Sequence, residues 1–332
     1  MAAPPPRRGH DRARGGAEPQ PARQPHPPGL SADRGRPRPD RAIRLGLVLG
    51  AGGTAGEAFH RGVLRAMDEA GLDPRAASVL VGTSAGAIVA ASVRRRGPAG
   101  EPPGVPPRPA ARGRVLRDRS MLLDLARRPR QALNAALLTP ELASGKQSLA
   151  FLAGALRDRH GSEWPAAPLW IVAVRRRDGR RVVFGGPDAP VTDVGSAVAA
   201  SCAIPGYFAA VEIDGVPYVD GGVHSPTNAD LLTGLDLDLV VISSPMSMDP
   251  RAVRPRLDLG LRLLFHRYLR NEVWALRRRG DRVVAIEPDA AVLGATRLNM
   301  MDGRRIDQIE QRAYELARRR LSDLGNSVGA SG

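Results

Sequence analysis

Several residue types are scarce in this chain of 332 residues, and each scarcity excludes a class of protein. Cys202 is the only cysteine, which excludes an internal disulfide framework and favours a reducing compartment. Lys146 is the only lysine, so nearly all of the positive charge is arginine. Aromatic residues make up 4% of the chain, so the core must rest on Ala, Val, Leu and Ile. With 42% hydrophobic residues, the chain can still form one sizeable domain.

Long apolar segments are also missing. No run of 18 consecutive apolar residues occurs, so a transmembrane helix is not expected. The arginines near the N-terminus are not followed by an apolar stretch, so a standard secretory signal is not expected either. Together with the single cysteine, these features predict a cytoplasmic protein, and they leave peripheral contact with a membrane open.

The net charge of +15 is concentrated in two segments. Residues 1–41 hold nine arginines against four acidic residues, and residues 94–130 hold eleven arginines against three. Three interpretations are open: solvated charge in disordered segments, a surface that attracts anionic lipid head groups, and nucleic-acid binding. No helix-turn-helix, zinc-finger or aromatic RNA-binding signature accompanies the arginines, so nucleic acid is not expected as a partner. Contact with an anionic membrane surface stays open.

Between residues 42 and 323, short apolar runs alternate with helical patterns. This alternation predicts one α/β domain, with a mostly parallel central sheet sandwiched by helices. Pro, Arg and Gly dominate residues 1–41, which we expect to be a disordered tail, and prolines mark residues 94–118 as a mobile insertion. A disordered C-terminus is expected over 324–332. The expected strands are 44–49, 78–81, 169–174, 181–184, 216–219, 237–242 and 283–286, and the expected helices are 55–69, 87–93, two or three pieces within 119–160, 192–201 and 304–321.

The first motif with chemical meaning is Gly82-Thr83-Ser84-Ala85-Gly86, of the form G-x-S-x-G, between an expected strand and an expected helix. A nucleophilic serine requires such a sharp turn, whose strained backbone leaves room only for small neighbours, here Gly82 and Gly86. The following helix directs its free amides and its dipole at the serine, which favours developing negative charge. The same pentapeptide also occurs as a tight turn with a capping serine, so alone it leaves the role of Ser84 open.

The second motif is a glycine-rich loop over residues 50–56, between the first strand and its helix. Its amides can face an anion, either the oxyanion of a hydrolase or the pyrophosphate of a nicotinamide cofactor, since Gly50 to Ala55 fits G-x-G-x-x-G/A. A dinucleotide site also needs an acidic residue at the end of the second strand, where Ser84 stands instead. The oxyanion hole is therefore favoured, with close helix packing as the structural alternative. Its candidate oxyanion and substrate-binding residues are Gly52, Gly53, Thr54 and Gly56.

The third motif is Asp220-Gly221-Gly222, at the end of an expected strand. A carboxylate within hydrogen-bonding reach of a serine hydroxyl can accept its proton as a general base. The two glycines let the backbone pass close to the nucleophile, although Asp-Gly-Gly is also a common turn, so the role of Asp220 stays open. His224 is the one histidine near this motif, and we expect it in a surface loop. His60 is expected to be a packing or surface residue.

Taken in order, the three motifs resemble the patatin-like phospholipase family, over about residues 44–322. The blocks that carry the resemblance are 46–56, 81–87, and 200–208 leading into 218–222. The resemblance implies an α/β sandwich that hydrolyses lipid acyl esters with a Ser-Asp dyad and without histidine. It implies Ser84 as the nucleophile, Asp220 as the base, and a lipid or acyl-ester substrate. No metal or other cofactor is expected, because no His/Cys/Asp cluster in the sequence has metal-ligand spacing.

The glycine loop departs from the pattern of this family. Ala55 stands where the family usually carries Arg or Lys, and Ala51 replaces a glycine. The missing guanidinium would weaken the fixation of the loop or remove a charged contact near the site, whereas the amides of Gly52 and Gly53 need no side chain. Two functions follow: a serine lipid acyl hydrolase of the phospholipase A, lysophospholipase or esterase type, or a catalytically weak scaffold or lipid-binding protein.

Overall fold

The computed structural model describes residues 43–95, 145, 147–252, 257–296 and 298–329. The predicted tail over 1–41 lies outside these residues, as do the predicted insertion from residue 96 onward and the helical pieces predicted before residue 145. The strands are β1 (Leu45–Leu49), β2 (Val79–Thr83), β3 (Leu169–Arg175), β4 (Arg181–Phe184), β5 (Val211–Ile213), β6 (Val216–Asp220), β7 (Leu239–Ser243) and β8 (Arg282–Ile286). The helices are α1 (Gly53–Glu69), α2 (Ala85–Val93), α5 (Ala150–His160), α6 (Val194–Ser201), α7 (Leu259–Arg277), α8 (Ala290–Ala295) and α9 (Ile306–Gly329).

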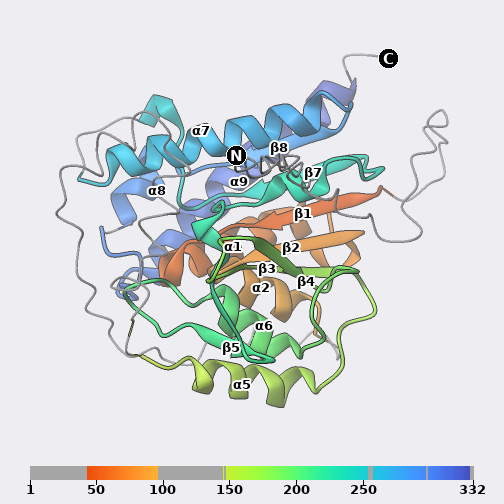
Figure 1. Ribbon diagram of the computed structural model, residues 1–332. Helices are drawn as coiled ribbons and strands as arrows, with labels where there is room; N and C mark the ends of the chain where they lie inside the picture. The colour runs from red at the N-terminus through yellow and green to blue at the C-terminus, as the bar shows by residue number, and fades with distance from the viewer. Residues whose placement is uncertain (1–42, 96–144, 146, 253–256, 297, 330–332) are drawn as a thin grey trace, which may run out of the picture.

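The strands form one 8-stranded mixed sheet, in the order β5-β6-β3-β2-β1-β7-β8, with β4 paired to β3 (Figure 1). Strands β3, β2, β1, β7 and β8 run parallel, and β4, β5 and β6 are antiparallel to their partners. The hairpin expected between 169–174 and 181–184 is confirmed by the pairing of β3 with β4. The predicted fold class, a mostly parallel sheet sandwiched by helices, is confirmed.

Alternation along the strands divides the apolar side chains between two faces of the sheet. In β1, Leu45, Leu47 and Leu49 belong to one core cluster, whereas Val48 belongs to another. The larger cluster is built with α1, α2, α5, α6 and α9, and the second cluster is built with α7. Figure 1 shows this division, with α7 along one side of the sheet and α6, covered by α5, along the other. The result is a three-layer arrangement of helices, sheet and helices.

The parallel register brings several strand ends to one edge of the sheet. Leu49 at the end of β1 pairs with Gly82 of β2 and with Ser243 at the end of β7. The loops that follow β1, β2 and β7 therefore leave the sheet together. Open α/β sheets bind their ligands at this edge, outside the carboxyl ends of the parallel strands.

Some elements were not predicted from the sequence. Helices α7 and α8 and the short strand β5 had no predicted counterpart. Helix α9 continues to Gly329, beyond the predicted end at residue 321 and through part of the predicted disordered segment 324–332, of which 330–332 lie outside the described residues. None of the helices in the described part of the chain is long and apolar enough to cross a membrane.

Candidate active site

Ser84 occupies a sharp turn between β2 and α2. Its backbone angles are φ 54° and ψ −118°, in a region that disfavours any side chain, and it is only 4% exposed. The small neighbours that the sequence motif predicted are required by packing. A Cβ atom on Gly82 would lie 2.6 Å from the Cα atom of Ala87, and one on Gly86 would collide with the carbonyl of Leu49. The turn, which we call the elbow, therefore has a strained backbone and admits only small neighbours.

The loop over residues 50–56 is enclosed on both sides. Gly53 has a φ of +57°, and a Cβ atom there would lie 2.9 Å from the carbonyl oxygen of Met300. A Cβ atom on Gly52 would lie 2.6 Å from Cγ of Pro245. Glycine is needed at both positions. Gly53 adopts left-handed backbone angles, and Gly52 has no room for a side chain.

The amides of this loop fall into two groups. Four of them donate hydrogen bonds to backbone carbonyls: Gly50 to Ser243, Ala51 to Pro226, Ala55 to Met300 and Gly56 to Gly52. Among the residues that the structure describes, the amides of Gly52, Gly53 and Thr54 donate no hydrogen bond. They belong to the N-terminal end of α1, where the first amides of any helix lack an internal partner. In the described part of the chain, the amides of Gly52, Gly53 and Thr54 thus have no acceptor, whereas the Gly56 amide donates to the carbonyl of Gly52.

Asp220 is the last residue of β6 and is 5% exposed. Its Oδ1 atom accepts a hydrogen bond of 2.7 Å from the amide of Gly222, and its own amide donates to the carbonyl of Ala203 at 3.0 Å. A Cβ atom on Gly221 would collide with the carbonyl of Val172. The Asp-Gly-Gly sequence therefore both orients the carboxylate and lets the chain pass against β3.

Strand pairing places the end of β6 level with the end of β2. Thr83 pairs with Val172 of β3, and the next residue of β3, Ala173, pairs with Asp220. The chain after Asp220 also turns toward the elbow, because a Cβ atom on Gly221 would lie 3.2 Å from Cγ2 of Thr83. The serine turn and the Asp-Gly-Gly turn therefore occupy the same edge of the sheet.

The glycine loop joins the same cluster. A Cβ atom on Gly222 would lie 3.4 Å from Cβ of Ala51, and the amide of Gly86 donates to the carbonyl of Gly50 at 3.2 Å. Three segments that are far apart in the sequence thus meet at the carboxyl edge of the central strands. These segments contain all of the predicted site residues, namely Gly52, Gly53, Thr54, Gly56, Gly82, Ser84, Gly86, Asp220, Gly221 and Gly222.

Ser201, at the end of α6, is a contributor to this site that the sequence analysis did not identify. Its hydroxyl accepts a hydrogen bond of 2.9 Å from the amide of Ser84 and donates one of 2.6 Å to the carbonyl of Val172. Two residues later, the carbonyl of Ala203 accepts a hydrogen bond from the amide of Asp220. The segment 201–203 therefore holds the backbone of both Ser84 and Asp220. Its position within the block 200–208 was the available signal.

His60 lies in the core rather than at the surface. On α1, its Nε2 atom is 2.8 Å from the carbonyl oxygen of Gly50 and its Nδ1 atom is 2.7 Å from Oγ of Ser243. Since a carbonyl only accepts, Nε2 carries the proton and Nδ1 accepts from the hydroxyl. Burial lowers the pKa of His60 to about 4, so the ring is neutral near pH 7. His60 thus anchors the start of the glycine loop.

His224 lies close to the Asp-Gly-Gly turn in the sequence. His224 is half-buried in the turn after Asp220, and its amide donates to the carbonyl of Gly221 at 3.0 Å. Over the described ranges, no group of three or more His, Cys, Asp or Glu side chains is arranged to hold a metal ion.

The fold and this cluster define an α/β protein in which a glycine loop, a strained serine turn and an Asp-Gly-Gly turn share one edge of the sheet. A family model for patatin-like phospholipases matches residues 47–233, more than half of the chain. The chain belongs to the patatin-like phospholipase family, and membership supports a lipid hydrolase function. The match begins in β1 and includes all three motifs, and it ends before β7, α7 and β8.

Two solved structures are similar to this chain. One is VipD from Legionella pneumophila, with 13% sequence identity, a TM-score of 0.39, and coverage of 85% of this chain and 67% of that chain. The other is the type III effector protein ExoU, with 18% identity, a TM-score of 0.36, and coverage of 85% and 53%. This chain thus spans about half of the length of the ExoU chain. No curated protein matches it.

Proposed function

We propose that this protein is a serine lipid acyl hydrolase in which Ser84 is the nucleophile and Asp220 is the general base. One observation carries the proposal: a strained, buried serine shares the carboxyl edge of the sheet with Asp220 and with three amides that have no acceptor among the described residues. A serine held at a φ of 54° needs a compensating role, and nucleophile turns are a well-attested one. Family membership supplies the class of substrate, a lipid acyl ester.

In the proposed mechanism, the carboxylate of Asp220 accepts the hydroxyl proton of Ser84 while Oγ attacks the carbonyl carbon of the ester. The tetrahedral intermediate collapses to an acyl-enzyme, and the leaving alkoxide takes the proton from Asp220. Water then attacks the acyl-enzyme and gives a proton to Asp220, which returns it to Ser84 as the fatty acid leaves. Neither half of the cycle requires a histidine or a metal ion.

The amides of Gly52, Gly53 and Thr54 hold the oxyanion in this proposal. They lie at the N-terminus of α1, where the helix dipole adds to their attraction for negative charge. Removal of one such donor typically costs roughly 10² to 10³ in rate. Because these donors belong to the backbone, the substitution of Ala for a basic residue at position 55 leaves them in place.

Hydrolysis of p-nitrophenyl esters and of phospholipids by matched variants tests the proposal. We expect the wild type to hydrolyse these substrates, and Ser84→Ala and Asp220→Asn to lower kcat by a factor on the order of 10⁴ or more. Ser92→Ala is the control, because Ser92 lies on α2, the helix that follows the serine turn, and its hydroxyl donates to the carbonyl of Ile88 within that helix. It should retain wild-type turnover.

Equal turnover in the wild type, Ser84→Ala and Asp220→Asn would exclude the proposed dyad. A folded wild type that binds lipid without any turnover would instead support the alternative of a catalytically weak scaffold or lipid-binding protein. The series therefore separates the two functions, since only the hydrolase depends on both side chains.

A further inference from the structure

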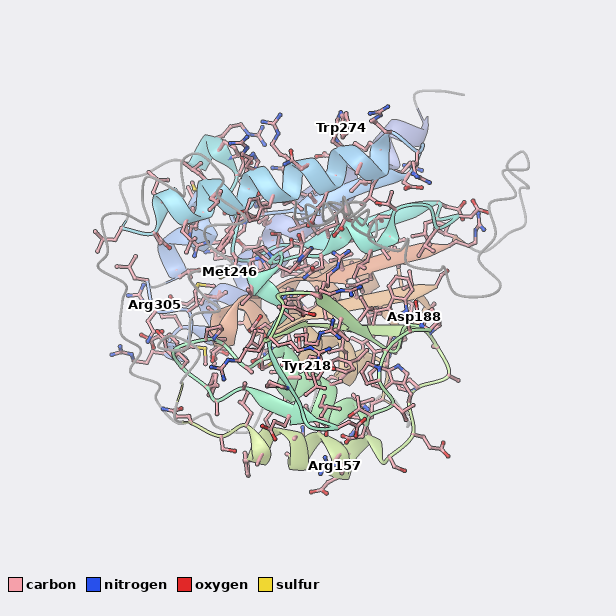
Figure 2. All side chains as sticks on the ribbon, viewed as in Figure 1. Arg157, Asp188, Tyr218, Met246, Trp274 and Arg305 are labelled. Carbon is pink, nitrogen blue, oxygen red and sulfur yellow. The ribbon has the colours of Figure 1, made fainter. Side chains whose placement is uncertain are left out.

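Helix α7 lies outside the segment that matches the family model, and its inward face carries two buried ionisable side chains. Arg262 is 3% exposed and Glu272 is 5% exposed. Trp274, by contrast, is 60% exposed. Figure 2 shows it on the outer side of α7. Burial of charged groups is costly and contributes little to net stability, so each of the two calls for a structural reason.

Glu272 binds the loop that follows the Asp-Gly-Gly turn. Its two carboxylate oxygens accept hydrogen bonds from Oγ of Ser225 at 2.6 Å, Oγ1 of Thr227 at 2.5 Å and the amide of Ala229 at 3.1 Å. Ser225, Thr227 and Ala229 are the donors in these three hydrogen bonds, and the carboxyl oxygens of Glu272 are the acceptors. Burial and the nearby Asp230 raise the pKa of Glu272, and these hydrogen bonds oppose that shift. The carboxylate therefore fixes both the side chains and the backbone of this loop.

The same loop contacts all three segments of the site. The carbonyl of Pro226 accepts the amide of Ala51, in the glycine loop, at 2.7 Å. The side-chain amide of Asn228 donates to Oγ1 of Thr83, beside Ser84, at 3.2 Å and to the carbonyl of Gly221 at 3.4 Å. Asn228 reaches both with left-handed backbone angles, at a φ of 54°. Residues 225–229, which we call the bridging loop, thus link the three segments.

Arg262, the other buried ionisable residue of α7, binds the segments that follow β7 and precede α9. Its Nη1 atom donates to the carbonyls of Pro245 and Ser247, each at 3.1 Å, and its Nη2 atom lies 3.4 Å from Sδ of Met300. Asp258, one turn earlier on the chain, accepts from Nε at 2.7 Å and balances the charge. The guanidinium therefore ties the segment after β7 to the segment before α9.

Both of those segments enclose the glycine loop. The ring of Pro245 lies against Gly52 and Gly56, because Cβ atoms there would approach its Cγ to 2.6 and 3.2 Å. The carbonyl of Met300 accepts the amide of Ala55 at 2.9 Å and packs on Gly53. Arg262 thus acts on the loop only through these neighbours.

We propose that α7 is the positioning helix of the active site: Glu272 fixes the serine and aspartate turns through the bridging loop, and Arg262 fixes the glycine loop through Pro245 and Met300. Neither side chain touches the substrate. The proposal rests on the proposed function for its effect on catalysis. It extends the functional unit beyond residues 47–233, the segment that the family model matches. Misplacement of reacting groups by about 1 Å can cost a factor of about 10² in rate.

The test combines enzyme kinetics with hydrogen–deuterium exchange on the full chain. The variants are Glu272→Leu and Arg262→Leu, with Glu272→Gln and Arg262→Lys as conservative counterparts that preserve the fold. Leu276→Ala is the matched control, because Leu276 is a fully buried residue of the same helix that belongs to the apolar core rather than to either network. It lowers stability by creating a cavity without removing a hydrogen bond.

We expect Glu272→Leu to speed hydrogen–deuterium exchange in the bridging loop, and Arg262→Leu to speed it over residues 50–56. Each variant should also lower kcat by about 10- to 100-fold with little change in KM. Glu272→Gln and Arg262→Lys should show smaller increases in exchange and smaller losses of kcat. Leu276→Ala should change neither the exchange of these loops nor kcat. Unchanged exchange in both loops, or equal effects in Leu276→Ala, would overturn the positioning role. If the wild type hydrolyses no ester, the proposed function fails, while the exchange data still decide whether α7 orders the loops.

Discussion

At the scale of single residues, Ser84 depends on neighbours that hold its backbone. Its amide is buried and donates to Oγ of Ser201, which is itself fully buried and fixed by the carbonyl of Val172. An alanine at position 201 has no side-chain acceptor, so the Ser84 amide would lose its partner. A buried polar group without a partner costs about 1–3 kcal/mol.

We therefore predict that Ser201→Ala lowers the free energy of unfolding by about 1–3 kcal/mol and lowers kcat by about tenfold or more, since the elbow loses its anchor. Urea unfolding and ester turnover measure the two effects. Ser196→Ala is the control, because Ser196 lies on the same helix but bonds to Asp193 and Arg157. Full activity in Ser201→Ala would show that the elbow needs no such anchor.

His60 provides a residue-scale prediction about pH. Burial lowers its pKa to about 4, below the ordinary value of 6.5, so the folded state favours the neutral ring. Above pH 6.5 the ring is neutral in both states and the stabilisation is complete. As the pH falls from about 6.5 toward about 4, the unfolded chain takes up a proton that the folded protein does not. The contribution lost over this window is about 3 kcal/mol.

His60→Gln tests this dependence, because a glutamine can both donate to Gly50 and accept from Ser243 but does not titrate. We expect the free energy of unfolding of the wild type to fall by about 3 kcal/mol more than that of the variant between pH 6.5 and 4. Urea titrations at several pH values give this difference. Parallel curves for the two proteins would show that His60 titrates normally in the fold.

At the scale of elements, the contact between α1 and α9 fixes the helix that carries the glycine loop. The helices meet at Gly62, where a Cβ atom would collide with the carbonyl of Glu310 and lie 2.8 Å from the amide of Tyr314. Gly154 on α5 is also in a helix, but a Cβ atom there would meet no atom within 4 Å. The two glycines therefore differ in the space around an added Cβ atom.

Gly62→Ala should therefore lower the free energy of unfolding by about 1–3 kcal/mol, because the added methyl group forces the helices apart. Gly154→Ala should raise it by about 0.5–1 kcal/mol, because alanine favours the helix. Thermal and urea unfolding measure both changes. A stabilising effect of the same size in both variants would contradict the close approach of α1 and α9.

The sequence predicted the elements whose patterns are local. Buried runs such as Leu169 to Val174 and the strand–glycine–helix order around Ser84 led to the correct strands and fold class. Helix α7 was missed although Phe265, Leu269 and Leu276 recur at helical spacing, because the intervening arginines and Glu272 obscure its apolar face. Contacts between distant segments, such as those of Glu272, have no local signal in a single sequence, and so the anchors of the site could not be predicted.

At the scale of the whole molecule, the net charge of +15 favours attraction to anionic lipid surfaces. We predict that the chain co-sediments with anionic vesicles more than with zwitterionic ones, and that added salt weakens this preference by screening. A chain without residues 1–41, which hold nine arginines and four acidic residues, should bind more weakly. Equal binding to both kinds of vesicle would exclude an electrostatic contact with the membrane.

The proposed hydrolysis depends on the nucleophilicity of Ser84, and covalent labelling by a fluorophosphonate probe measures this nucleophilicity most directly. Peptide mass spectrometry then identifies the labelled residue. We predict that the probe modifies Ser84 in the folded wild type, that Asp220→Asn slows labelling strongly, and that Ser84→Ala abolishes it. Labelling that persists in Ser84→Ala, or a wild type that resists the probe while folded, would contradict the assignment of this serine.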